Sequence, residues 1–310
     1  MRILFTIPHV YRQRGAKFQS TSMASRPEPV HGSDSAGAEV RARALTMCLT
    51  SLHQTFGIHQ AHIMNITTAC NDLITAEIEV VICTTTGADN LVDRLPGHMF
   101  RHHPTNAEPL LLGYECHAVL ADNIGKFDYF CFLEDDIHIA DPLFFWKQIW
   151  FTRSFGSQAV LQPHRFELSQ RLPIQKLYVD GPIRDATISP RFQNKYVRPR
   201  VRGQILGTDV EFERVDNPHS GCFFLTSTQM ELWMRQSYFL DRATDFWGPL
   251  ESAATLGLMR TFEVYKPALA NAGFLEVRHL DNRYLGGLVH LPPNLALRSP
   301  TKRHGIAPQL

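Results

Sequence analysis

The stretch FDYFCFLEDD, residues 127–136, decides how this sequence is expected to fold. Its first seven residues are almost entirely apolar, which is typical of a strand buried on both faces of a parallel sheet. Three carboxylates, Glu134, Asp135 and Asp136, follow at the point where that strand ends. The stretch therefore predicts a buried strand whose carboxyl end presents a cluster of acids.

The sequence before this stretch alternates between strand-like and helix-like patterns. Residues 3–8 and 79–87 are apolar runs, whereas apolar residues recur at helical spacing in 38–57 and 108–125. This β-α-β-α-β order predicts an α/β fold, with a Rossmann-like, mostly parallel central sheet and helices on both faces. In such sheets ligands bind beyond the carboxyl ends of the strands, which is where the three acids are expected.

Length and composition favour one globular domain without a dominant charge. The 310 residues are 44% hydrophobic, and 31 Lys and Arg are balanced by 30 Asp and Glu. This balance provides no net field to attract nucleic acid, so no nucleic-acid partner is expected. The six cysteines form no C-x-x-C pair, which is typical of reduced thiols in a cytoplasmic protein. The first strand begins too early for a signal peptide, and no transmembrane segment is expected because no apolar run is long enough.

The three acids indicate a divalent cation. Adjacent carboxylates repel one another, and Mg²⁺ or Mn²⁺ relieves that repulsion because these hard cations prefer carboxylate oxygen. Side chains alternate along a strand, so Glu134 and Asp136 are expected to point one way and Asp135 the other. The alternative is that Asp135 or Asp136 caps a turn while Glu134 is solvated.

The stretch YFCFLEDDIHIADPLFF, residues 129–145, resembles the metal-binding acidic motif of nucleotide-sugar-dependent glycosyltransferases with the GT-A fold. Its E-D-D form, followed by an acid, a proline and aromatic residues, is most similar to the N-acetylglucosaminyltransferase I group. Residues 112–130 are also similar to the helix and strand that lead into this motif in GT-A enzymes. The order of elements over residues 1–170 fits that fold, whereas later similarities are isolated.

The resemblance implies roles for the acids and for the end of the first strand. Asp136, the last acid, would bind Mn²⁺ or Mg²⁺ directly. Glu134 and Asp135 would hold the ribose of a nucleotide-sugar or the waters of the metal. Pro8 and His9 would receive the nucleobase and the ribose, although an ordinary turn at the end of a strand would have the same sequence.

Two later segments are further candidates for the same site. Thr84 and Thr86, at the end of another predicted strand, would line the nucleotide pocket, or they belong to an ordinary turn. His279 follows a strand-like run, and many GT-A enzymes, particularly retaining ones, use a histidine near the carboxyl terminus as an additional metal ligand. Ligation by His279 would therefore favour retention, whereas a base at Glu251 favours inversion. Imidazole is a competent ligand for Mn²⁺. The alternative for His279 is a structural histidine, since the chain contains 15 of them.

An inverting transferase needs a carboxylate base, because a sugar hydroxyl is a weak nucleophile without one. The segment DFWGPLESAATLGLM, residues 245–259, offers Asp245 and Glu251. Pro249 predicts the start of a helix with Glu251 in its first turn. This placement resembles the acidic residue on the acceptor side of inverting GT-A enzymes, although a glutamate there also simply complements the helix dipole.

Three other segments carry less specific patterns. Residues 13–37 form a Gly-, Ser- and Pro-rich loop that is too long for a simple connector. Residues 191–202 interleave basic and aromatic side chains, which suits closure over a diphosphate, contact with an anionic acceptor or nucleic acid, or a solvated loop. Thr228 and Glu231 have the spacing of a capping box, which predicts a helix start.

Together these observations predict a single GT-A-like domain over residues 1–310. Residues 1–165 would bind the donor, a UDP- or GDP-sugar, and residues 166–310 would bind a glycan or another hydroxyl-bearing acceptor. The expected activity is metal-dependent, inverting glycosyl transfer. The alternatives are a metal-dependent nucleotidyl or phosphoryl transferase and a non-catalytic sugar- or nucleotide-binding module. The sequence has no P-loop, no G-x-G-x-x-G and no G-x-S-x-G.

Overall fold

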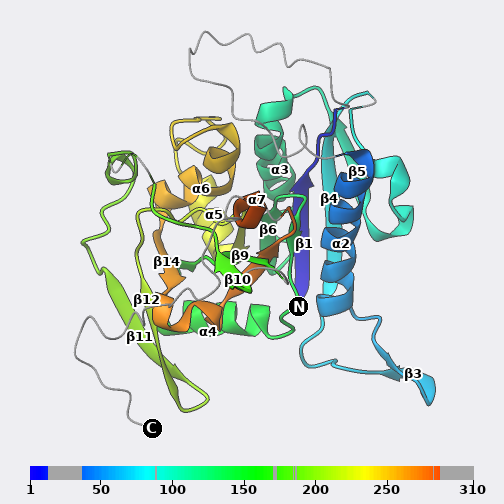
Figure 1. Ribbon diagram of the computed structural model, residues 1–310, viewed down its shortest axis with the longest axis horizontal. Coiled ribbons are helices and arrows are strands. Elements are labelled where there is room, and N and C mark those ends of the chain that lie inside the picture. The colour runs from blue at the N-terminus through cyan, green and yellow to red at the C-terminus, as the bar shows by residue number, and fades with distance from the viewer. Residues whose placement is uncertain are drawn as a thin grey trace.

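The computed structural model describes residues 1–12, 37–87, 89–169, 173–183, 185, 187–281 and 283–286. These residues form a mixed α/β fold, which confirms the expected class. The central sheet has the strand order β13-β6-β1-β4-β5 (Figure 1), in which β6, β1, β4 and β5 run parallel and β13 runs antiparallel to β6. Its strands are β1 (Arg2–Pro8), β4 (Glu77–Thr85), β5 (Arg101–Thr105), β6 (Tyr129–Leu133) and β13 (Cys222–Thr226).

Helices cover both faces of this sheet because successive side chains of its strands point to opposite sides. In β1, Ile3, Phe5 and Ile7 pack in one buried cluster with α2 and α4, whereas Leu4 packs in a second cluster with α3, α5 and α6. The helices are α2 (Ala38–Phe56), α3 (Leu112–Ala121), α4 (Phe144–Phe155), α5 (Ser227–Met234), α6 (Pro249–Thr261) and α7 (Arg283–Gly286). The 3₁₀ turns are η1 (Val92–Arg94), η2 (Gly97–Met99), η3 (Pro109–Leu111), η4 (Ser189–Arg191) and η5 (Leu269–Phe274).

Smaller sheets with the orders β10-β9-β15-β7, β11-β12-β14-β8 and β2-β3 complete the described fold. The strand β15 runs parallel to β9 and antiparallel to β7, so it places the chain near residue 279 beside the chain near residue 137. The strands are β2 (Ala61–His62), β3 (Asn65–Ala69), β7 (Ile137–His138), β8 (Ala159–Leu161), β9 (His164–Leu168), β10 (Lys176–Tyr178), β11 (Arg200–Ile205), β12 (Thr208–Glu213), β14 (Glu263–Pro267) and β15 (Glu276–His279).

The predicted capping box is wrong by two residues. The helix α5 is capped by Thr226, whose hydroxyl accepts a hydrogen bond from the backbone N–H of Gln229 at 3.3 Å. Oε1 of Gln229 accepts in return from the backbone N–H of Thr226 at 3.0 Å. Thr226 ends β13, so the strand turns directly into the helix and Thr228 lies inside it. The predicted loop 13–37 lies outside the described residues except for Gly37.

The basic segment 191–202 leads into an antiparallel ribbon formed by β11 and β12. Four of its five cations form ion pairs with neighbouring acids, which partly neutralise the positive charge that a diphosphate or nucleic acid would meet; Arg191 instead lies over the ring of Phe192. The pairs are Lys195–Asp216 at 2.6 Å, Arg198–Glu263 at 3.3 Å, Arg200–Glu211 at 3.3 Å, Arg200–Glu213 at 3.5 Å and Arg202–Glu211 at 2.6 Å.

Two further expectations concern the state of the cysteines and the presence of membrane-spanning helices. All six cysteines are free thiols, and five of them are buried. Within the part of the chain that the structure describes, none of the helices combines the length and the apolar character needed to cross a bilayer.

Candidate metal centre and its pocket

A pocket of 580 Å³ opens beyond the carboxyl ends of β1 and β6. Pro8 of β1 and the acids Glu134, Asp135 and Asp136 after β6 line it, as do Glu251 of α6 and His279 of β15. Six of the residues predicted from the sequence therefore come together at one place. The location agrees with the rule that parallel sheets bind ligands beyond the carboxyl ends of their strands.

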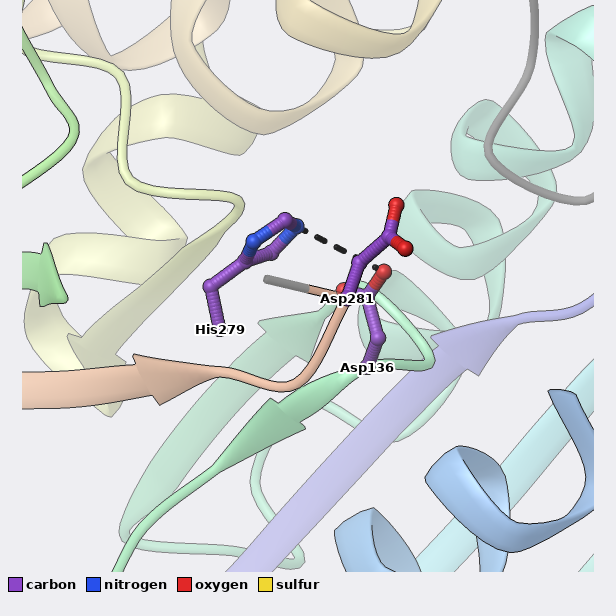
Figure 2. Close-up of side chains that lie close together, drawn as sticks. All are labelled: Asp136, His279 and Asp281. Carbon is purple, nitrogen blue, oxygen red and sulfur yellow. Dashed lines mark ion pairs between the residues drawn. The ribbon is translucent and has the colours of Figure 1, made fainter. Parts of the chain in front are cut away.

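Asp136, His279 and Asp281 form a group in the pocket that could hold a metal ion. One ligand atom from each lies within 4.8 Å of the others, and Figure 2 shows the three side chains converging. Nε2 of His279 is 3.6 Å from Oδ2 of Asp136. The pairing of β15 with β7 produces this approach, because the backbone N–H of Leu280 donates to the carbonyl of Asp136 at 3.0 Å.

A buried carboxylate orients His279. Oε1 of Glu167 on β9 lies 2.8 Å from Nδ1 of His279, and Glu167 is fully buried. A carboxylate accepts hydrogen bonds, so Nδ1 carries the donated proton and Nε2 faces the Asp136 side of the cluster. Backbone N–H groups of Tyr284 and Leu285 also donate to Glu167, at 3.2 and 2.7 Å. This carboxylate–histidine pair is the arrangement that metal sites use to hold an imidazole ligand.

The electrostatics of the cluster favour a cation. Burial lowers the pKa of His279, but the carboxylates of Asp136 and Glu167 raise it, and the net change is an increase. Among the described atoms, the buried Oδ1 of Asp136 has no hydrogen-bond partner. An unpaired buried carboxylate oxygen is costly unless something else binds it. Two carboxylates and one oriented imidazole therefore fit a divalent ion such as Mn²⁺ or Mg²⁺.

Both carboxylate oxygens of Asp135 contact side chains of the protein. Its Oδ1 accepts a hydrogen bond from the guanidinium of Arg41, and its Oδ2 lies 2.6 Å from Nδ1 of His9. Nε2 of His9 accepts from the backbone N–H of Leu91 at 3.1 Å, and His9 is fully buried. Despite burial, Arg41 and His9 hold the pKa of Asp135 well below its usual range. His9 is fully buried and is not among the described residues that line the pocket, so its predicted contact with a nucleotide is wrong. Asp135 does line the pocket, and its predicted contact with the ribose or the waters of the metal stays a prediction.

Glu134 occupies the other side of the acidic cluster. Its Oε2 lies 3.3 Å from Nη1 of Arg165, and its Oε1 lies 3.8 Å from Nε2 of His219. Burial raises the pKa of Glu134 to about 7; Arg165 opposes this increase, whereas the carboxylates of Asp136 and Glu251 add to it. Glu134 is thus protonated more easily than an ordinary glutamate.

Glu251 faces the pocket from the first turn of α6, as the sequence predicted. Gly248 precedes it, and a β-carbon there would lie 2.9 Å from Oε2 of Glu251. Asp245 is exposed and is not among the described residues that line the pocket. Of the two candidate bases, only Glu251 is placed to contact a ligand in this pocket.

The two threonines do not reach the pocket as predicted. Thr84 is fully buried, and its hydroxyl lies 2.7 Å from Nε2 of His102. The hydroxyl of exposed Thr86 donates to Oδ1 of Asn106 at 3.0 Å. Neither occurs among the described residues that line the pocket, because both point toward the edge strand β5.

Four residues of the site were not identified from the sequence: Arg41, Arg165, His219 and Asp281. Asp281 alone carries a local signal, since it follows His279 at a spacing of two. Arg41 lies in an amphipathic helix and Arg165 in a short strand, where single charged residues usually face solvent. Their role depends on contacts between distant parts of the chain.

The wall of the pocket around Glu251 differs from the metal-binding wall. Phe246, Trp247 and Leu250 line it, so a ligand would meet apolar surface on this side and charge on the other. Such a division suits a ligand with a charged end and a ring. No protein-family model matches the sequence, and no curated protein matches it.

Proposed function

We propose that this protein is a metal-dependent glycosyltransferase that moves a sugar from a nucleoside-diphosphate sugar to an acceptor hydroxyl with inversion. One observation carries the proposal: Asp136, His279 and Asp281, which could hold a metal ion, lie in the same pocket that Glu251 lines. A transferase of this kind needs both groups, a cation for the leaving diphosphate and a carboxylate for the acceptor proton.

In this proposal, different residues of the pocket bind the metal and accept the proton. Asp136, His279 and Asp281 would hold Mn²⁺ or Mg²⁺, which supplies positive charge to the departing diphosphate. Glu251 accepts the proton of the acceptor hydroxyl. The acceptor oxygen then bonds to the anomeric carbon while the bond between that carbon and the diphosphate oxygen breaks. Glu134 and Pro8 line the donor side, which suits contact with the nucleoside.

A GT-A type of fold is part of this proposal. The parallel strands β4, β1 and β6, with acids at the end of β6, support a donor site built by residues 1–165. Residues 166–310 supply Glu251 to the acceptor side. His279 and Asp281 belong to the second half of the chain but join Asp136 in the metal cluster, so the donor site would require both halves.

A panel of UDP- and GDP-sugars, assayed with Mn²⁺ or Mg²⁺ for release of nucleoside diphosphate, tests the proposal. We expect one donor to be consumed and the rate to fall by roughly a hundredfold or more in Asp136→Asn, because a charged ligand is lost. Glu251→Gln should lower kcat by about a hundredfold or more while donor binding persists. Asp209→Asn, an exposed change on β12, is the matched control.

The alternatives give different results in the same experiments. Consumption of nucleoside triphosphates without any sugar donor would assign the site to nucleotidyl or phosphoryl transfer. Metal-dependent binding of nucleoside diphosphate without turnover of any donor would indicate a binding module. Either result contradicts the proposed glycosyl transfer.

A further inference from the structure

The hairpin formed by β2 and β3 stands away from the rest of the fold (Figure 1). All residues of both strands are exposed. Ile63, Met64 and Ile66, at and beside its turn, are 88%, 84% and 80% exposed. From residue 57 to residue 71 the sequence contains no Asp, Glu, Lys or Arg. The hairpin is therefore an uncharged arm whose largest side chains are apolar and face solvent.

Hydrogen bonds fix the base of this arm. The backbone N–H of Cys70 donates to the carbonyl of Gln60 at 2.7 Å, and the side-chain amide of Asn71 donates to Oε1 of Gln60 at 2.8 Å. The backbone N–H of Ala76 donates to the carbonyl of Phe56 at 2.7 Å, and Phe56 is buried in the core. The arm is anchored to the buried end of α2, so its apolar tip has a defined place.

The strand edges of the arm lack the usual protection against pairing. The sheet contains β2 and β3 alone, so each has an outer edge that pairs with no other strand in the described part of the chain. Exposed edges elsewhere carry charge or proline: Arg101 and Pro104 in β5, Lys176 in β10, and Arg200 and Arg202 in β11. Such residues oppose association between edges, and neither β2 nor β3 has one.

We propose that β3 pairs with β3 of a second copy of this chain, which forms a four-stranded sheet across a two-fold dimer interface. An isolated two-stranded hairpin is marginally stable, and additional strands with an apolar face stabilise it. The partner must offer backbone donors and acceptors together with apolar surface. An identical uncharged hairpin offers both without repulsion between like charges.

A lipid bilayer meets these requirements less well. Open sheet edges are not tolerated in hydrocarbon, because their backbone groups find no partner there. Residues 57–71 also contain no Lys or Arg to attract anionic headgroups.

The base of the arm lies near Arg2 at the start of β1, whereas the pocket lies beyond Pro8 at the end of β1. A dimer formed through the arm therefore leaves the pocket open.

Sedimentation equilibrium of the full chain tests the proposal. The expected result is a reversible monomer–dimer equilibrium that Ile66→Lys shifts to monomer, because the two lysines would lie diagonally across the centre of the new sheet on the same face, where like charges repel. Leu206→Lys, at the turn between β11 and β12, is the matched control; Leu206 is 95% exposed, and this variant should remain dimeric. Circular dichroism should show that both variants keep the fold, since neither side chain is buried.

A charge exchange at the centre of β3 tests the pairing itself. Thr67→Lys and Thr67→Glu should each be monomeric alone, and mixing them should restore a dimer. A wild-type chain that stays monomeric, a dimer that Ile66→Lys leaves intact, or a mixture that does not associate would overturn the proposal. Co-sedimentation of a monomeric chain with phosphatidylcholine vesicles, abolished by Ile66→Lys, would assign the arm to lipid and overturn it equally.

Discussion

Gly221 faces Glu134 so closely that a β-carbon on the glycine would lie 2.5 Å from Oε2 of the glutamate. The glycine has a φ of +63°, and its carbonyl accepts a hydrogen bond from the backbone N–H of Glu134 at 2.8 Å. The strand β13 and the acidic cluster therefore approach each other at a point where side-chain atoms do not fit. The position of Glu134 in the pocket depends on this glycine.

Gly221→Ala should lower the free energy of unfolding by two separable contributions. The left-handed backbone costs about 1 kcal/mol for alanine, and displacement of Glu134 from Arg165 costs about 1 kcal/mol more. Gly125→Ala isolates the first contribution, because Gly125 has a φ of +81° and open space around it. Urea unfolding of both variants measures the difference. Equal losses would show that the contact with Glu134 contributes nothing.

Glu167→Gln should weaken Mn²⁺ binding by about 10- to 100-fold, as expected for a residue that orients a metal ligand. Glutamine keeps the size of the side chain and one acceptor oxygen. Its NH₂ group is a hydrogen-bond donor, however, so it would face Nδ1–H of His279 or a backbone N–H, which are donors too. Isothermal titration with Mn²⁺ measures the affinity. Glu276→Gln on β15 is the control, because Glu276 pairs with Lys176 instead. Similar affinities in the two variants would remove Glu167 as a positioning residue.

Asp281→Asn should lower the Mn²⁺ affinity by roughly tenfold or more, since the affinity of oxygen-rich sites follows the number of charged ligands. The fold should be retained, because Asp281 lies two residues beyond the end of β15 and lines the pocket. Titration of the variant beside Asp209→Asn separates a ligand effect from a change in overall charge. An unchanged affinity would leave Asp136 and His279 as the only protein ligands among these three.

His117 should make stability depend on pH below neutrality. Burial lowers the pKa of His117 to about 4, although its hydrogen bond to the carbonyl of Ala253 opposes the decrease. In the unfolded chain the pKa is about 6.5. Between these values the unfolded chain binds more protons, so stability falls as the pH falls. We expect a loss of about 2 kcal/mol from pH 7 to pH 5.

Urea unfolding of wild type and His117→Gln at both pH values checks this expectation. The variant should lose the contribution of His117 to the pH dependence, whatever its stability at pH 7. His59→Gln is the control, because His59 is exposed. If His117→Gln and wild type lose the same stability between pH 7 and pH 5, the buried imidazole is not the source.

The elements that the sequence predicted are those with a strong local pattern. The strand β6 is an apolar run, and α2 has apolar residues at helical spacing, so neither needs distant information. The strands β5 and β10 were missed because they are short and largely exposed, with few apolar residues. Their strand conformation depends on neighbours in the sheet.

The residues of the candidate site likewise include some that a local sequence pattern predicts and others that depend on distant contacts. Asp136 is recognisable because three acids follow a buried strand. The contacts of Asp135 with Arg41 and His9 join residues far apart in the chain, and spacing cannot predict them. His9 was expected to face a nucleotide, but the sequence does not indicate which way a side chain turns after a strand ends. Burial and partner choice are properties of the assembled fold.

The pairing of β15 with β7 has a consequence for folding. Asp136 belongs to the middle of the chain, whereas His279 and Asp281 enter the cluster only after a late strand has docked beside it. The three groups can therefore bind a metal together only after β15 has paired with β7. Conversely, a bound ion stabilises the docked state in proportion to its affinity. Amide hydrogens of β15 should therefore exchange more slowly with solvent when Mn²⁺ is added, and those of the distant β2–β3 arm should not.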